Sequence, residues 1–338
     1  MLVARGTYAD RYASADSVEY ESVPAHRRLR RLDLARGWVG LQRNVTRSQL
    51  APMLVEQRTW DPSVVFTHNL PELVGLIDTN RHRAVLYAHN QLLRTYSRRE
   101  AGRLLARASA VVCVSEWLLR DTLRFVPRGM DERFVTVHNG VDIERFHPGE
   151  TDRRGDRLNV VVVGRVIPVK GADVALKALA ILNRDDVALT VVGSQGFDPG
   201  APLTRYERSL RELAQRVRSS VRFVRSVPRD EVAALIRQAD VMVVPSRWPE
   251  PFGNTAIEGL ASGLAVVASR VGGLPEVVGD AGLMVEPGDP EALAAALGRL
   301  ADDSQLLDHL GRVGRARAVQ RDWAWAARRL DEALVALT

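Results

Sequence analysis

Two glutamates stand in a segment that could bind a phosphorylated sugar. The segment reads Glu250-Pro-Phe-Gly-Asn-Thr-Ala-Ile-Glu258, and it follows an apolar run, Val241–Pro245, that predicts a strand. The residues after the turn favour a helix, and N–H groups at a helix start attract phosphate. We expect Gly253 to allow a close backbone approach and Asn254 to cap the helix. Glu250 and Glu258 could then accept hydrogen bonds from sugar and ribose hydroxyls; the plainer alternative is two ordinary acids.

Two cations follow a second predicted strand. The segment Gly164-Arg165-Val-Ile-Pro-Val-Lys170 comes directly after Asn159–Val163. Ligands bind at the carboxyl ends of strands in open parallel sheets. Arg165 and Lys170 would suit a diphosphate leaving group, whose charge grows in the transition state. The alternative is that both are solvated loop cations.

Two further segments at predicted strand ends carry weaker signals. His89 follows the apolar run Ala84–Ala88, and a histidine in this place could be catalytic or structural. His68 has a similar placement, for which a structural role is favoured. Paired glycines occur in Ser269-Arg-Val-Gly-Gly-Leu-Pro-Glu276, where the backbone could lie close to a ligand or a facing domain, or could simply turn.

Basic residues gather in Arg27–Arg31 and Arg98–Arg107, and both stretches are typical of amphipathic helices. The chain has 47 lysines and arginines against 41 acidic residues, a net charge of +6. These stretches are either solvated helix faces or docking surfaces for an anionic lipid or an acidic acceptor. No nucleic-acid motif accompanies the charge, so we expect no nucleic-acid partner.

Short β-branched runs that alternate with amphipathic stretches must position these residues, and this alternation predicts an α/β fold with parallel sheets. The strands expected first are Leu2–Ala4, Val18–Val23, Val64–His68, Ala84–Ala88, Ala110–Ser115 and Phe134–His138. Those expected next are Asn159–Gly164, Ala188–Gly193, Val221–Val224, Val241–Pro245, Ala265–Ala268 and Gly282–Val285. The polar segment Phe146–Gly155 between the two sets is typical of a linker. We therefore predict domains at 1–150 and 151–321, with a helix at about 322–338 that completes the first.

The composition excludes several classes of protein. The chain of 338 residues is long enough for two cores, and it has no apolar run of membrane-spanning length and no signal peptide. Its one cysteine, Cys113, rules out a disulfide within the chain and a cysteine-rich metal site. No Asp-x-Asp pair ends a strand, so we predict no metal. We expect a cytoplasmic location, with contact at the inner membrane face through the basic helices as an open alternative.

Taken together, these motifs resemble glycosyltransferase family 4, the retaining glycosyltransferases of the GT-B fold. The two glutamates match the family's E-x7-E signature, Arg165 and Lys170 match its donor-phosphate pair, and Ser269–Glu276 matches its late Gly-Gly-x-Pro-Glu loop. Val114–Glu116, Val137–Asp142, Phe146–Pro148 and Trp323–Trp325 also resemble family segments in the family's order. The resemblance covers about residues 60–338.

The resemblance implies two Rossmann-like, doubly wound domains that face a cleft, the first for the acceptor and the second for the nucleotide sugar. A hexose-like sugar would move to an acceptor hydroxyl with retention, without a metal or another cofactor. A UDP-sugar is favoured as donor because UDP is common in the family. The acceptor stays open between lipid-linked sugars, polysaccharides and small-molecule scaffolds.

The resemblance also implies a role for each matching residue. Glu258 would hold the ribose, Arg165 and Lys170 the diphosphate, and Glu250 the hydroxyls of the donor sugar. His89 would lie near the sugar and the attacking hydroxyl. The other donor-binding positions are Gly164 in the phosphate loop, Val227 near the base, and the backbone donors Gly253, Asn254 and Thr255.

The chain departs from the family pattern at its beginning. The family's first strand, its Gly-rich loop and the following helix have no counterpart, and Leu2-Val-Ala-Arg-Gly resembles the family's second strand. We therefore expect a gap or a new edge in the first sheet, and impaired catalysis with nucleotide binding retained. Two alternatives stay open: a binding or regulatory protein that keeps the donor fold without turnover, and a GT-B phosphorylase or epimerase.

Overall fold

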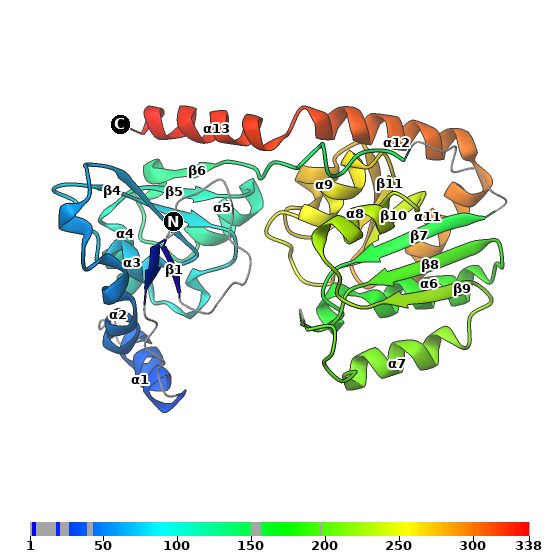
Figure 1. Cartoon of the computed structure of the whole chain (residues 1–338), viewed down its shortest axis with the longest axis horizontal. Coiled ribbons are helices and arrows are strands. Elements are labelled where there is room, and N and C mark those ends of the chain that lie inside the picture. Colours follow the sequence, from blue (N-terminus) through cyan, green and yellow to red (C-terminus); the bar gives the residue numbers. More distant parts are fainter. Residues whose placement is uncertain are drawn as a thin grey trace. The chain divides into compact units, whose positions relative to one another are not determined.

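The computed structural model describes residues 2–4, 18–20, 27–38, 43–149, 157–196 and 198–337. By its internal contacts the chain divides into two compact units (Figure 1). The first runs up to Val137 and takes in the stretch from Leu330, and the second is His138–Arg329. Most of the predicted linker, from Glu150 to Gly155, lies outside the described residues. Each unit has its own parallel sheet.

The first unit contains a four-stranded parallel sheet in the order β3-β4-β5-β6. Its strands are β3 (Val64–His68), β4 (Arg83–Ala88), β5 (Ala108–Cys113) and β6 (Phe134–Thr136). A separate parallel pair is formed by β1 (Leu2–Ala4) and β2 (Val18–Tyr20). Within the described residues the two sheets share no backbone pairing, so β3 is an edge strand there.

Two helices of the first unit begin at serine caps. The helices of this unit are α1 (Arg27–Trp38), α2 (Asn44–Leu50), α3 (Pro71–Val74), α4 (Arg98–Leu105) and α5 (Glu116–Leu123), with short 3-10 turns between them. The side chains of Ser97 and Ser115 accept hydrogen bonds from the first turns of α4 and α5. The last helix, α13 (Trp323–Ala336), ends in this unit, where Leu334 packs against Val85 and Val112.

The second unit has six parallel strands in the order β12-β11-β10-β7-β8-β9 (Figure 1). They are β7 (Leu158–Val163), β8 (Val187–Val192), β9 (Ser220–Val224), β10 (Val241–Val244), β11 (Ala265–Ser269) and β12 (Gly282–Val285). From β7 the chain adds strands first on one side and then on the other, which is the doubly wound order of a Rossmann-like fold. The order reverses between β7 and β10, and ligands bind at the carboxyl ends beside such a switch point.

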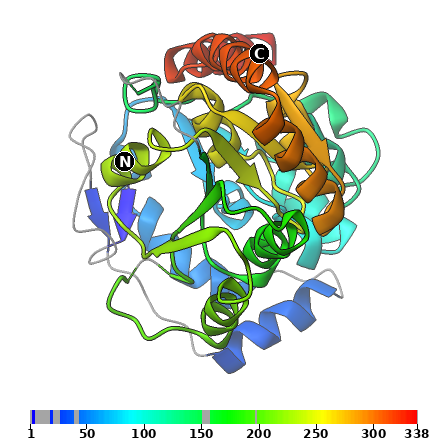
Figure 2. The same ribbon diagram turned by 90° about the vertical axis from the view of Figure 1, so that its right-hand side faces the viewer.

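Helices cover both faces of this sheet (Figure 2). They are α6 (Ala172–Leu182), α7 (Arg205–Ala214), α8 (Arg229–Ile236), α9 (Asn254–Ala261), α10 (Leu274–Val278), α11 (Pro290–Asp302) and α12 (Ser304–Val319). Alternate strand residues such as Val160 and Val162 share one core cluster with α6 and α11. The opposite face meets α9, where Gly259 lies against Met242. Among the described residues, none of the helices of either unit is long and apolar enough to cross a membrane.

Candidate functional site

Five of the predicted residues line one small cavity at the switch point of the second unit. The cavity measures about 50 Å³, and its lining includes Gly164, Arg165, Lys170, Glu250 and Thr255. The first three follow β7, and the other two follow β10. Because these two strands are neighbours in a parallel sheet, their carboxyl ends bring together segments about 80 residues apart in the sequence.

An ion pair between Lys170 and Glu250 forms the centre of this cluster. The Lys170 ammonium lies 2.6 Å from Oε1 and 2.8 Å from Oε2 of Glu250. The Ser246 hydroxyl also donates to the Glu250 carboxylate, which is buried. A buried carboxylate needs such partners, since an unpaired charge out of water is costly. Arg165 is exposed, and its side chain has no ion pair among the described residues.

The paired glycines hold the loop that carries Glu250. The Gly273 N–H donates to the Glu250 carbonyl at 2.7 Å. Gly272 has a φ of 64°, and a Cβ there would lie 2.3 Å from the same carbonyl oxygen. Only glycine fits this position, because both the left-handed backbone and the close approach exclude a side chain. The close approach expected from the sequence is therefore made to the chain itself.

Helix α9 begins beside this loop and directs its first N–H groups outward. The prediction that Asn254 caps the helix is wrong, because Gly253 occupies the N-cap with a φ of 113°. Asn254 is the first helical residue, and its side-chain oxygen accepts a hydrogen bond from Asn139 at 3.0 Å. The N–H groups of Asn254 and Thr255 have no acceptor within the helix, so they can serve an anion.

Glu258 lies one turn into α9 and is buried. Burial raises the pKa of its carboxyl to about 7, although the charges of Arg229 and Arg145 act in the opposite direction. Arg229 reaches it from the start of α8 with a distance of 2.6 Å to Oε1. Arg229 was not among the predicted site residues. Its only sequence signal is that it follows the predicted base-binding Val227 by two residues, as the first residue of α8.

In the first unit, His89 and His68 form a stacked pair at the ends of β4 and β3. His68 Nδ1 lies 2.9 Å from His89 Nε2, and the ring centroids are 5.2 Å apart. Tyr87 stacks on His89 at 4.5 Å. Burial, helped by the nearby His68, lowers the pKa of His89 to about 4, and burial also lowers the pKa of His68. Near neutral pH both imidazoles are therefore uncharged, so one donates and the other accepts.

The backbone after β4 fixes the direction of His89. The His89 N–H donates to the side-chain oxygen of Asn69 at 2.8 Å. Asn69 itself has a φ of 57°, a left-handed conformation that asparagine tolerates better than most residues. His68 pairs with Tyr87 across β3 and β4, and this register places the His68 ring beside the rings of Tyr87 and His89. His68 thus belongs with His89, although its sequence placement alone favoured a structural role.

Two family models match the chain. Glycosyltransferase Family 4 matches residues 2–145, and Glycosyl transferases group 1 matches residues 157–303. The D-inositol 3-phosphate glycosyltransferase of Streptomyces griseus is 37% identical over 221 residues, 57% of this chain and 46% of that protein. The protein of the same name from Corynebacterium glutamicum is 38% identical over 211 residues, 58% of this chain and 49% of that protein. The chain thus spans about half the length of these relatives.

Solved structures share the fold. Anabaena Alr3699/HepE, in complex with UDP and glucose, has a TM-score of 0.73 at 23% identity, over 94% of this chain and 86% of that one. Sucrose-phosphate synthase from Thermosynechococcus elongatus has a TM-score of 0.71 at 24% identity, over 95% of this chain and 84% of that one. These likenesses show the GT-B fold. Since the two family models follow one another along the chain and cover the sheets of both units, the chain belongs to glycosyltransferase family 4, the glycosyl transferases group 1.

Proposed function

We propose that this chain is a retaining glycosyltransferase that moves a hexose-like sugar from a nucleotide-sugar donor to an acceptor hydroxyl. The observation that carries the proposal is the cluster around the Lys170–Glu250 pair, which brings a cation, an acid and the start of α9 at Thr255 to one cavity. Such a set can hold a diphosphate on one side and sugar hydroxyls on the other.

In this proposal the donor takes over interactions that the protein makes with itself. The diphosphate binds Lys170 and Arg165, whose charges stabilise the negative charge that grows on the leaving group. Glu250, released from Lys170, accepts hydrogen bonds from the sugar hydroxyls. Glu258 binds the ribose hydroxyls in competition with Arg229, which lies beside it in the free protein.

His89 serves the acceptor side in this proposal. With a pKa of about 4 it is neutral at physiological pH, so it acts as a hydrogen-bonding group and not as a cation. We propose that the acceptor hydroxyl attacks the anomeric carbon from the same face from which the leaving group departs. Such an attack retains the configuration at that carbon. Transfer without a divalent metal is part of the same proposal, and equal rates with and without a chelator would support it.

The donor and the acceptor are chosen for testing from the comparisons. The HepE structures contain UDP, UDP with glucose, or UDP-glucose, and this favours a UDP-sugar. The relatives are named for D-inositol 3-phosphate, so a phosphorylated cyclitol is the first acceptor to try. Lipid-linked sugars, polysaccharides and other small-molecule scaffolds complete the panel.

The test begins with calorimetric titration of the chain with UDP, GDP and ADP beside a Glu258→Ala variant. We expect one nucleotide to bind at micromolar concentration and the variant to lose that binding. The matching sugar nucleotides are then incubated with the acceptor panel, and NMR of the product reports the anomeric configuration. Binding of none of the three nucleotides by the folded chain would overturn the donor site. Binding without product from any acceptor would instead indicate a nucleotide-binding protein without turnover.

A further inference from the structure

A second and larger cavity lies in the first unit, where α3 packs against both α2 and α4. Its volume is about 220 Å³, whereas a single water needs roughly 10–15 Å³ of such space. Its charged lining consists of Arg43, Arg47, Glu72, Glu100, Arg103 and Arg107. Four arginines thus face two glutamates, and neither His68 nor His89 takes part.

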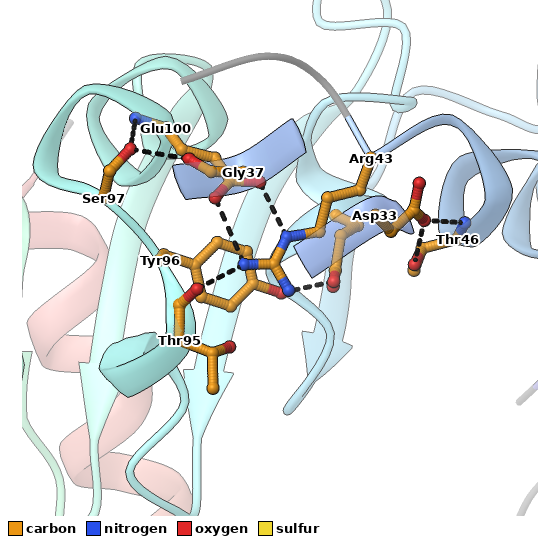
Figure 3. Close-up of polar contacts among 9 residues, drawn as sticks. Asp33, Gly37, Arg43, Thr46, Thr95, Tyr96, Ser97 and Glu100 are labelled. Atoms are coloured by element: carbon orange, nitrogen blue, oxygen red, sulfur yellow. Dashed lines mark hydrogen bonds and ion pairs between the residues drawn. The ribbon is translucent and has the colours of Figure 1, made fainter. Parts of the chain in front are cut away.

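Both glutamates already have partners within the protein. Arg43 donates to Glu100 from Nε at 2.7 Å and from Nη2 at 3.2 Å, and its guanidinium lies 3.7 Å from the centre of the Tyr96 ring (Figure 3). Burial alone would lower the pKa of Arg43, but the bond to Glu100 together with the charges of Tyr96, Glu100 and Glu72 raises it above its usual value. Glu72 accepts the hydroxyl hydrogen of Tyr96, whose pKa rises well above its usual value because of burial and this carboxylate.

The walls that carry these groups are held in place by further polar contacts. Asp33 of α1 accepts hydrogen bonds from the Thr46 N–H at 2.7 Å and the Thr46 hydroxyl at 2.8 Å, which ties α1 to α2 (Figure 3). The Nη2 group of Arg43 also donates to the Thr95 carbonyl at 2.6 Å. On one side of the cavity, Arg43 is thus paired with Glu100, while Glu72 is held by the neutral Tyr96 hydroxyl.

Among the residues that the structure describes, three arginines around the cavity have no acidic partner. Arg107 donates to two neutral acceptors, the Gly75 carbonyl at 3.4 Å and the Thr79 hydroxyl at 3.2 Å. Arg47 and Arg103 make no ion pair or side-chain hydrogen bond within the described part of the chain. Arg103 lies on α4 and Arg107 just after its end, and because both line the cavity, their like charges repel each other mildly. An anion between them would remove this repulsion.

We propose that this cavity binds a phosphate group carried by a small molecule or by a lipid headgroup. Each guanidinium offers a planar fork of N–H donors that matches two oxygens of a phosphate. Several guanidinium groups can therefore bind the tetrahedrally arranged oxygens of one phosphate. The exposed Arg103 and Arg47 meet the ligand first, and Arg107 closes the site against α3. The basic stretch Arg98–Arg107 thereby gains a specific role in place of a general attraction to anions.

The first arm of the test measures the binding of inorganic phosphate and of glycerol phosphate to the whole chain by calorimetry. Arg103→Gln is compared with Arg99→Gln, which removes the same charge from the same exposed helix but lies outside the cavity lining. We expect Arg103→Gln to weaken binding about tenfold and Arg99→Gln to change it less than about twofold. Phosphate that binds at Lys170 contributes equally in both variants and does not affect the comparison.

The second arm distinguishes the source of the phosphate. Sedimentation with phosphatidylglycerol vesicles is compared with phosphatidylcholine vesicles for the same two variants. Loss of phosphatidylglycerol binding in Arg103→Gln alone would support the proposal with a lipid headgroup as ligand, and an Arg103-dependent response to glycerol phosphate would support a small molecule. If neither ligand distinguishes Arg103→Gln from Arg99→Gln, the attraction is general and the proposal is overturned.

Discussion

The two units use the carboxyl ends of their strands in opposite ways. In the second unit, charged groups meet there in pairs, Lys170 with Glu250 and Arg229 with Glu258. In the first unit the same place in the sheet holds His68 and His89, two stacked imidazoles whose pKa values are lowered. Arginines without an acidic partner among the described residues of that unit line the cavity between α2, α3 and α4.

This difference suggests how binding and chemistry are divided between the units. The cation of an ion pair can bind a phosphate in place of its carboxylate partner, so the second unit is suited to a highly charged ligand. A neutral imidazole contributes hydrogen bonds without attracting an anion, so the first unit is suited to a hydroxyl group. The predictions that follow test this division, beginning with the largest expected effect.

Lys170→Ala should have the largest effect, because it removes the cation that we propose binds the donor phosphate. It also leaves the buried Glu250 without its main partner. We expect kcat/KM for the nucleotide sugar to fall by roughly 10²–10³. Lys177→Ala is the matched control, since that lysine pairs with Asp173 and is about half exposed. Equal kinetics for the two variants would contradict a role of Lys170 in donor binding.

His89→Ala should lower kcat by roughly 10² while the nucleotide affinity stays unchanged, because the Lys170–Glu250 and Arg229–Glu258 pairs belong to the other unit. Steady-state kinetics measures the first quantity and calorimetry with the nucleotide the second. His309→Ala, on the exposed side of α12, controls for the loss of a histidine. A large loss of nucleotide affinity in His89→Ala would break the division between the units.

His68→Gln should lower kcat by about tenfold, because the hydrogen bond that orients His89 is weakened. The charge of His68 also contributes to the low pKa of His89. Without it the pKa of His89 rises, and His89 becomes protonated at a higher pH. The acid limb of the activity profile should therefore move to a higher pH in the variant. An unmoved limb together with an unchanged kcat would leave His68 no positioning role.

Glu258→Gln should have the smallest effect: it should change the nucleotide affinity only a few fold and remove the dependence of that affinity on pH. The carboxyl of Glu258 has a pKa of about 7, and its ionised form is the better acceptor for ribose hydroxyls. Nucleotide affinity should therefore rise as the pH increases through about 7, and binding near that pH should release protons. Calorimetry in buffers of different ionisation enthalpy measures this release, which the variant should lack. Proton uptake by the parent chain on nucleotide binding would show instead that the nucleotide prefers the protonated form of Glu258.

The sequence alone predicted the elements of both sheets and most residues that the second unit collects at its cavity. Each of the twelve predicted strands is present, although Val18–Val23 is described only as far as Tyr20. The strand expected at Ala110–Ser115 ends at Cys113, because Ser115 caps the next helix instead. These successes have one cause: apolar periodicity and caps are local properties, and residues after parallel strands share one edge of a sheet.

Tertiary structure alone decided the partners. Arg229 meets Glu258, Gly272 lies against the backbone of Glu250, and His68 reaches His89, each across more than twenty residues. The arginine cavity requires α2, α3 and α4 to pack together, which the charges in Arg98–Arg107 do not reveal. Charge and hydrophobicity along a chain fix which groups are present. Which groups become neighbours depends on strand order, register and helix packing, and these are set by the burial of side chains throughout each unit.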